Sequence, residues 1–344
     1  MEYVYYHFKM NKLIFKLFYI KVPSKLLILF FIVFLTGCNF GVTGATIKTI
    51  PNETAKNTEV YFCPKDDCGS ILETHINSAN YSVHCALYDI NLKNVINALA
   101  MKSKAIDVKI VMDSSNQNGQ IKGEGTRLDD NEQLMHNKFC IFDDNTVITG
   151  SFNPTANDNG FNNNNIIVVY SNALAKNYED EFKELWNGRF GQGDKVKNPI
   201  LLVNNIKIEN YFCPEDNCAQ QITGLIKNAK RSVYFMSFSF TSKEIADSLI
   251  YSKNFDTRGI FDTGQASSRF SQFGRLKDFG FDVKKDKSKH KMHHKVFIID
   301  NETVVTGSFN PTLSADTKND ENLLIVHDKK IANAYLEEFD SLWN

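Results

Sequence analysis

The protein has 344 residues, of which 42% are hydrophobic and 23% are charged. This composition excludes a disordered chain, a collagen and a protein with many membrane spans, and the length predicts about two domains. The 39 Lys and Arg residues nearly balance the 40 Asp and Glu residues, which argues against a surface that is basic throughout. The 27 Phe residues supply ample core material, so no metal or cofactor is needed to hold the fold together.

The first 37 residues have the features of an export signal. Five lysines precede an apolar run over residues 26–35, which is too short to span a bilayer but typical of a signal-peptide core. The Leu-Thr-Gly sequence before Cys38 is similar to a lipobox, in which Cys38 would be lipidated and become the mature N-terminus. A plain signal or anchor helix, a cytoplasmic protein and a start at Met10 remain alternatives. We expect an extracytoplasmic, membrane-anchored lipoprotein at the cell surface or in the periplasm.

A flexible tether is expected between this anchor and the first domain. Residues 38–57 are rich in Thr, Asn and Gly, a composition typical of linkers. Removing residues 1–37 takes away five Lys and one Glu, which leaves 34 basic and 39 acidic residues and a net charge of −5. Global charge therefore does not attract an anionic partner to the mature chain.

The rest of the chain contains an internal repeat. Four segments of its first half recur in its second half in the same order: 60–68 with 210–218, 135–143 with 292–300, 149–155 with 306–312, and 178–187 with 335–344. The repeat predicts two copies of one domain, over residues 58–190 and 207–344, with a linker over residues 191–206.

Each copy alternates strand and helix patterns. In the first copy we expect helices over residues 70–79 and 91–102, and strands over residues 108–113, 146–148 and 165–170. Each copy ends in a Tyr-x3-Phe-x2-Leu-Trp pattern, which places its aromatic residues on one helix face that we expect to pack in the core. This alternation predicts an α/β fold with mixed β-sheets flanked by helices.

A His-x-Lys-x4-Asp pattern followed by Gly-Ser-x-Asn occurs once in each copy. Its residues are His136, Lys138, Asp143, Ser151 and Asn153 in the first copy and His293, Lys295, Asp300, Ser308 and Asn310 in the second. One such match could arise by chance, but two in register indicate a site. Because residues i and i+2 of a strand share a face, the His and Lys of each copy point the same way.

Two copies placed face to face would surround one pocket with two imidazoles and two ammonium groups, which suits a phosphodiester. The lysines neutralise nonbridging oxygens, and the Ser and Asn side chains donate hydrogen bonds to the phosphate. One histidine attacks phosphorus to form a phosphohistidine, and the other protonates the leaving oxygen and later acts as base for water. Lysine charge does the electrostatic work of a divalent ion, and neither copy shows a clustered ligand set, so we expect no metal and no cofactor.

With these motifs, residues 58–344 resemble the phospholipase D superfamily of phosphodiesterases, whose two HKD motifs meet at a pseudo-twofold axis. The resemblance implies two tandem domains related by that axis, a site completed within one chain, and activity as a monomer. It also implies that Asp143 and Asp300 are structural rather than chemical.

The two copies differ just before their final strand. Members of the superfamily usually place a carboxylate there that hydrogen-bonds a catalytic histidine across the axis. The second copy has Glu321 at this position, whereas the first copy has Asn164. We expect Glu321 to orient His136 and favour its imidazolium, and His293 to face only Asn164 and to have a lower pKa. His136 is then the nucleophile and His293 the acid and base; the alternative is that Asn164 marks weakened activity.

Substrate preference rests on weaker signals. Residues 284–291 form a dense basic stretch that we interpret as a contact to a phosphate backbone or an anionic headgroup, with a solvated loop as the alternative. Each copy is about the size of the minimal bacterial nucleases of the superfamily, and no long insertion builds an acyl-chain groove. We therefore favour cleavage of DNA or RNA. The alternatives are a phospholipase D or cardiolipin hydrolase that releases phosphatidic acid at the membrane, and a catalytically weak nucleic-acid-binding lipoprotein.

The remaining cysteines fall into two groups. Four of them occupy equivalent Cys-Pro-x3-Cys loops: Cys63, Cys68, Cys213 and Cys218. Outside the cytoplasm each loop can close a local disulfide, and a shared zinc site or free thiols remain alternatives. Cys85 and Cys140 align with Phe235 and Phe297 of the other copy, which indicates buried core positions rather than a catalytic thiol.

Overall fold

The computed structural model describes residues 49–116, 125–252 and 255–344. The signal segment, Cys38 and the tether up to residue 48 lie outside the described residues. Residues 50–344 form one compact unit that contains both copies of the repeat. In the described part of the chain, no helix is long and apolar enough to cross a membrane.

The first copy is a seven-stranded sheet with helices. Its elements are β2 (Glu59–Cys63), α2 (Cys68–Ser78), β3 (Ser82–Leu87), α3 (Lys93–Lys102), β4 (Asp107–Met112), β5 (Thr126–Leu128), β6 (Lys138–Phe142), β7 (Thr146–Gly150), α4 (Ala156–Gly160), β8 (Asn164–Tyr170) and α5 (Asn172–Trp186). The strand order is β2-β8-β7-β6-β3-β4-β5. Strands β3, β4 and β5 pair in parallel and the others are antiparallel, so the sheet is mixed, as predicted.

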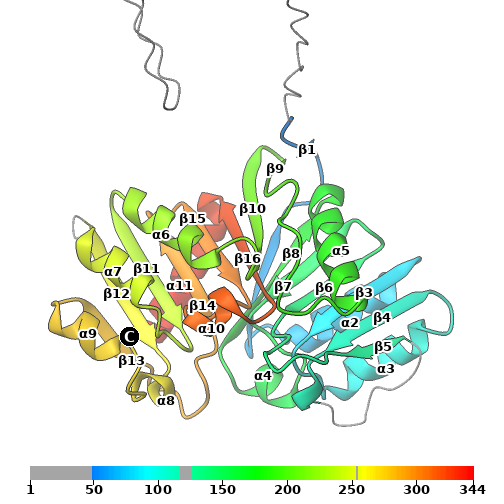
Figure 1. The fold of residues 1–344 in the computed structure, drawn as a ribbon, viewed down its shortest axis with the longest axis horizontal. Coiled ribbons are helices and arrows are strands. Elements are labelled where there is room, and N and C mark those ends of the chain that lie inside the picture. The colour runs from blue at the N-terminus through cyan, green and yellow to red at the C-terminus, as the bar shows by residue number, and fades with distance from the viewer. Residues whose placement is uncertain (1–48, 117–124, 253–254) are drawn as a thin grey trace, which may run out of the picture. The chain divides into compact units, whose positions relative to one another are not determined.

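The second copy repeats this arrangement in a nine-stranded sheet. Its elements are β10 (Ile206–Cys213), α6 (Cys218–Asn228), β11 (Ser232–Ser237), α7 (Lys243–Tyr251), β12 (Asp256–Phe261), α8 (Thr263–Ala266), α9 (Phe273–Asp278), β13 (Asp282–Lys285), β14 (Lys295–Ile299), β15 (Thr303–Gly307), α10 (Leu313–Thr317), β16 (Glu321–His327) and α11 (Lys329–Trp343). The order β10-β16-β15-β14-β11-β12-β13 is that of the first copy. The predicted duplication is therefore present in the topology, and Figure 1 shows the two sheets side by side.

Two short strands extend the second sheet and correct the expected tether and linker. Strand β9 (Ile200–Val203) lies in the predicted linker and forms a hairpin with β10, and β1 (Asn52–Glu53) lies in the predicted tether and pairs with β9 in parallel. The Asn204 side chain also bonds the backbone N–H and C=O of Ala55, each at 2.9 Å. These strands satisfy backbone groups that the edge of β10 would otherwise leave unpaired, so residues 52–53 and 200–203 belong to the sheet.

The two sheets share a core that contains the closing helices. The predicted aromatic face of α5 is buried through Tyr178 and Phe182, and that of α11 through Tyr335 and Phe339, all in one cluster with residues of both sheets. Helices α2 and α3 cover the other face of the first sheet, and α6 and α7 cover that of the second. The aromatic faces pack in the core, as expected.

The described cysteines form three disulfides. Two are the local bridges expected in the Cys-Pro-x3-Cys loops, so these cysteines are not arranged as a shared zinc site. The third joins Cys85 to Cys140, which the sequence interpretation assigned only to buried core positions. These residues are buried and lie directly opposite each other on β3 and β6. Phe235 and Phe297 oppose each other in the same way in the second copy, so a disulfide replaces an aromatic cross-strand pair.

Candidate active site

The two histidine motifs meet across the boundary between the copies. His136 lies two residues before the start of β6, and His293 lies two residues before the start of β14. Both side chains are buried, and both residues are 7% exposed. The backbone N–H of His136 donates to the carbonyl of Asp320 at 2.9 Å, and that of His293 donates to the carbonyl of Asn163 at 2.8 Å. Each motif is thus bonded to the other copy, and the predicted pairing about a pseudo-twofold axis is present.

A buried aspartate holds each histidine segment from its own copy. Asp113, just after β4, accepts a hydrogen bond from the backbone N–H of Met135 at 3.1 Å. Asp262, just after β12, accepts one from the backbone N–H of Met292 at 3.2 Å. The sequence interpretation missed both carboxylates, although each follows an equivalent strand of the repeat.

Glu321 reaches across the axis to His136, as expected. Its Oε2 lies 2.8 Å from Nδ1 of His136 and accepts a hydrogen bond from the Ser308 hydroxyl at 2.6 Å. The carboxylate is fully buried. With Nδ1 donating to Glu321, Nε2 of His136 carries the lone pair that a nucleophile needs.

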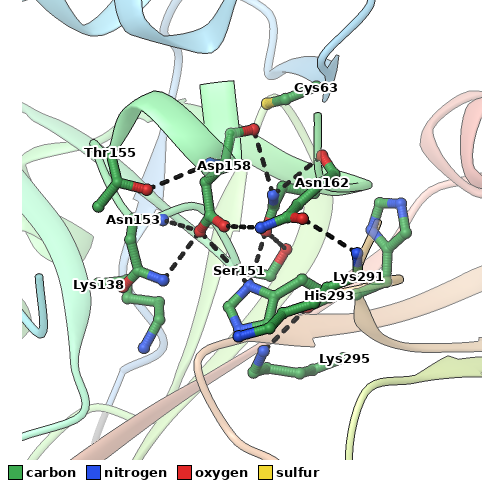
Figure 2. A network of polar contacts seen from close by, with 12 residues as sticks. Cys63, Lys138, Ser151, Asn153, Thr155, Asp158, Asn162, Lys291, His293 and Lys295 are labelled. Atoms are coloured by element: carbon green, nitrogen blue, oxygen red, sulfur yellow. Dashed lines mark hydrogen bonds and ion pairs between the residues drawn. The ribbon is translucent and has the colours of Figure 1, made fainter. Parts of the chain in front are cut away.

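His293 has the expected amide partner and a second one. Its Nδ1 lies 2.8 Å from Oδ1 of Asn164. The expectation that His293 faces only Asn164 is wrong, because Oδ2 of Asp158 lies 3.5 Å from the same nitrogen. Figure 2 shows Asp158 and His293 within one polar network. Asp158 escaped the sequence interpretation because the equivalent position of the second copy is Ala315.

The motif lysines are buried beside their histidines. Nζ of Lys138 donates to the carbonyl of His136 at 2.8 Å, and Nζ of Lys295 donates to that of His293 at 2.9 Å. Both lysines are 3% exposed. Burial lowers the pKa of Lys138 to about 8 and holds that of Lys295 well below its usual range. Water screens the two amines poorly here, so in their protonated form they attract a phosphate strongly.

Each histidine also has an aromatic neighbour from its own copy. The ring of Tyr88 meets His136 edge-on at 4.8 Å between centroids, and that of Phe238 meets His293 in the same way at the same distance. These ring contacts help to fix the orientation of the two imidazoles through packing.

Burial controls the protonation of the histidines. It lowers the pKa of His136 to about 4, although the charge of Glu321 acts in the opposite direction. Burial and the charges of Lys295 and Lys138 hold the pKa of His293 well below its usual range. Glu321 favours the imidazolium of His136, as expected, but the effect of burial on the pKa is larger. Burial therefore favours the neutral imidazole of His136, which is the state a nucleophile requires.

The Ser and Asn residues of the two Gly-Ser-x-Asn segments lie among the polar groups that surround the two histidines. Ser308 donates to Glu321, and Ser151 bonds the side chain of Asn165 at 3.2 Å. Nδ2 of Asn153 donates to Asp158 at 2.8 Å. The Oδ1 atoms of Asn153 and Asn310 are buried and have no hydrogen-bond partner among the described residues. These two amides are therefore the members of the motif with unused polar capacity at the site.

The motif aspartates lie away from the histidines and organise backbone. Asp143 accepts hydrogen bonds from the backbone N–H groups of residues 80, 81 and 82 at 2.7–3.0 Å. Asp300 accepts the corresponding bonds from residues 230, 231 and 232 at 2.6–3.1 Å. Each fixes the turn that enters β3 or β11, which agrees with a structural role.

A cavity of about 520 Å³ opens beside His293. Phe238, the ring against His293, lines it together with the exposed ring of Phe161, which stacks on His290 at 4.9 Å. The end of the basic stretch, residues 289–291, also lines it. Lys284 instead lies over the ring of Trp343, 4.0 Å from its centroid. Only the last part of the predicted basic stretch therefore borders the site.

The described residues contain no group of three or more His, Cys, Asp or Glu side chains placed to hold a metal ion. The charges that the structure does place at the site are the two buried ammonium groups of Lys138 and Lys295 and the carboxylates of Glu321 and Asp158.

Comparison with known proteins identifies the family. The family model described as "Cardiolipin synthase, PLD-like domain" matches residues 72–186 and 222–343, one match in each copy. The chain belongs to the phospholipase D superfamily of phosphodiesterases. The phospholipase D of Rickettsia conorii is 33% identical over 142 residues, which cover 41% of this chain and 71% of that protein. The mitochondrial cardiolipin hydrolase of Xenopus tropicalis is 35% identical over 136 residues, which cover 38% of this chain and 65% of that protein.

A solved structure extends the likeness to both copies at the level of the fold. The phosphatidylserine synthase of Haemophilus influenzae superposes with a TM-score of 0.65 over 85% of this chain and 88% of its own, at 12% identity. The tandem α/β architecture is therefore also the fold of that structure.

Proposed function

We propose that the protein hydrolyses phosphodiester bonds of nucleic acids through a phosphohistidine intermediate and without a metal ion. Nε2 of His136 attacks phosphorus, while His293 gives a proton to the leaving oxygen. Lys138 and Lys295 neutralise the charge that develops on the nonbridging oxygens. Water, with His293 as base, then releases the phosphate from His136.

We prefer a nucleic acid to a phospholipid as the substrate because of the side chains that line the cavity next to Phe238, the ring in contact with His293. Its lining combines the rings of Phe161 and Phe238 with amide, hydroxyl, carboxylate and basic side chains. Exposed rings with cations nearby suit stacked bases and a phosphate backbone. An acyl chain would need a predominantly apolar lining. We therefore favour a nucleotide over a lipid as the group next to the scissile phosphate.

Phospholipid hydrolysis is the second candidate. It is supported by the names of the relatives, a phospholipase D and a cardiolipin hydrolase. The predicted lipid anchor at Cys38 would also hold the enzyme at a membrane. We propose this extracytoplasmic, anchored location together with activity as a monomer, since one chain supplies both histidines.

A panel of substrates in EDTA tests the proposal. The purified full chain is incubated with labelled single-stranded DNA, double-stranded DNA, RNA, and vesicles of phosphatidylcholine or cardiolipin, with H136A as the control. Cleavage of nucleic acid that disappears in the variant supports the proposed function. Release of phosphatidic acid with nucleic acid intact would replace it with the phospholipase. Silence on every substrate would favour a weak or binding-only site.

A further inference from the structure

The two copies carry their site carboxylates at different positions of the same loop. The segments 149–155 and 306–312 align with an offset of 157, and this offset continues through α4 and α10 into β8 and β16. At this offset Asn164 matches Glu321, and Asp158 matches Ala315. Each copy thus supplies one carboxylate that contacts the motif histidine of the other copy, and the two carboxylates lie six residues apart in register.

Asp158 is firmly held at the site. It is 4% exposed and lies on the short helix α4. Oδ2 accepts hydrogen bonds from the backbone N–H of Asn153 at 2.9 Å and from its Nδ2 at 2.8 Å, and Oδ1 accepts one from Nδ2 of Asn162 at 2.7 Å. Figure 2 shows the carboxylate between these donors and His293. These three hydrogen bonds fix the position of the Asp158 carboxylate beside His293.

An amide and a carboxylate support a histidine differently. Oδ1 of Asn164 accepts the Nδ1 proton of His293 and so sets the tautomer, but it brings no charge. The carboxylate of Asp158, 3.5 Å from Nδ1, is placed where a negative charge would oppose the cost of a buried imidazolium. In the other half of the site Glu321 supplies both contact and charge to His136.

We propose that Asp158 is a positioning residue that replaces the carboxylate absent at Asn164 and supports the protonated form of His293 in catalysis. The inference rests on the phosphodiester chemistry of the proposed function, but not on nucleic acid as its substrate. In the first step the P–N bond to His136 forms, the P–O bond breaks, and the proton of His293 passes to the leaving oxygen. In the second step His293 takes a proton from a water molecule, the oxygen of that water bonds phosphorus, and the P–N bond to His136 breaks.

Several charged groups face His293 and set the background against which Asp158 acts. They are Lys295 from β14, Lys138 from β6, His136 from the other motif and Lys291 from its own loop. All of them disfavour an additional positive charge. Asp158 contacts the ring, so its removal takes away a carboxylate that directly opposes these charges at His293.

Two small phosphodiesters that differ in leaving group test the role. A nitrophenolate leaves without a proton, whereas a phenolate needs an acid. We expect D158A in the full chain to lower kcat on diphenyl phosphate by about tenfold or more, with KM unchanged, and to change kcat on bis(p-nitrophenyl) phosphate by less than about threefold. The alkaline limb of the diphenyl phosphate profile should move to lower pH.

A second substitution separates support of His293 from a role in folding. D158A/N164E gives the first copy the arrangement of Ala315 and Glu321, and we expect it to regain most of the lost activity. D316N is the matched control: Asp316 lies on α10, bonds the backbone N–H of Ala219 and corresponds to Asn159. Equal losses on both substrates, or a double variant as impaired as D158A, would overturn the proposal.

The protonation of His293 can be followed without turnover. In protein labelled with ¹³C at histidine, NMR titration should give a lower pKa for His293 in D158A than in the wild type, and a restored one in D158A/N164E. An unchanged pKa in D158A would contradict the proposal even if neither ester is cleaved. A wild type that cleaves neither ester but shows the expected pKa changes would refute the proposed function alone.

Discussion

Replacing Glu321 by Gln probes the contact that joins the copies. The side chain is fully buried, accepts the Nδ1 proton of His136 at 2.8 Å and accepts the hydroxyl of Ser308 at 2.6 Å. A hydrogen bond to a charged group contributes about 1.5–3 kcal/mol. If this contribution is made in the transition state, E321Q lowers kcat/KM by roughly 10- to 160-fold, since about 1.4 kcal/mol corresponds to a factor of ten.

The pH profile gives this prediction a sign. Glu321 raises the pKa of His136 against the effect of burial, which brings it to about 4. Without that charge the pKa falls further, so the acidic limb of kcat/KM in E321Q should move to lower pH. The assay is hydrolysis of bis(p-nitrophenyl) phosphate between pH 3.5 and 8, with E302Q as control because Glu302 is exposed on the turn before β15. A loss under twofold, or an acidic limb that moves to higher pH, would refute the reasoning.

The remaining predictions concern stability. Because burial lowers the pKa of His136 from 6.5 to about 4, the unfolded chain binds this proton first as the pH falls, and stability is lost between these values. Between pH 7 and 4.5, urea unfolding should show H136N losing about 2.4 kcal/mol less than the wild type, and equal losses would contradict this. The disulfide between Cys85 and Cys140 closes a loop of 55 residues, and that between Cys213 and Cys218 a loop of five. Removing the longer one should cost about 4 kcal/mol and the shorter about 2 kcal/mol, so a larger loss for the shorter loop would count against the account.

The site could be predicted from sequence where chemistry repeats. His136 and His293 recur with their Lys, Ser and Asn partners, and such a duplication predicts that the copies meet. Glu321 could be predicted as the hydrogen-bond partner of His136, because it occupies the position at which the superfamily usually has a carboxylate. Asp158 did not, because the two copies place their carboxylates at non-equivalent positions and only the folded loop brings Asp158 to His293.

Other features depend on pairing and burial that a sequence does not display. The bridge between Cys85 and Cys140 requires the register of β3 against β6. The hairpin of β9 and β10 turns at Asn204 and Asn205, both with positive φ, a turn signal inside a segment interpreted as a linker. The pKa of His136 depends on how deeply the ring is buried, so its direction could not be read from the charge of Glu321 alone.

Trapping the covalent intermediate tests the central claim that the two histidines have distinct roles in one site. H293N lacks the base that activates water, while bis(p-nitrophenyl) phosphate needs no acid to lose its leaving group. In EDTA this variant should release about one nitrophenolate per chain in a burst. Peptide mapping under alkaline conditions should then find the phosphoryl group on His136. A burst that H136N retains, or a phosphoryl group on another residue of the wild type, would contradict the account.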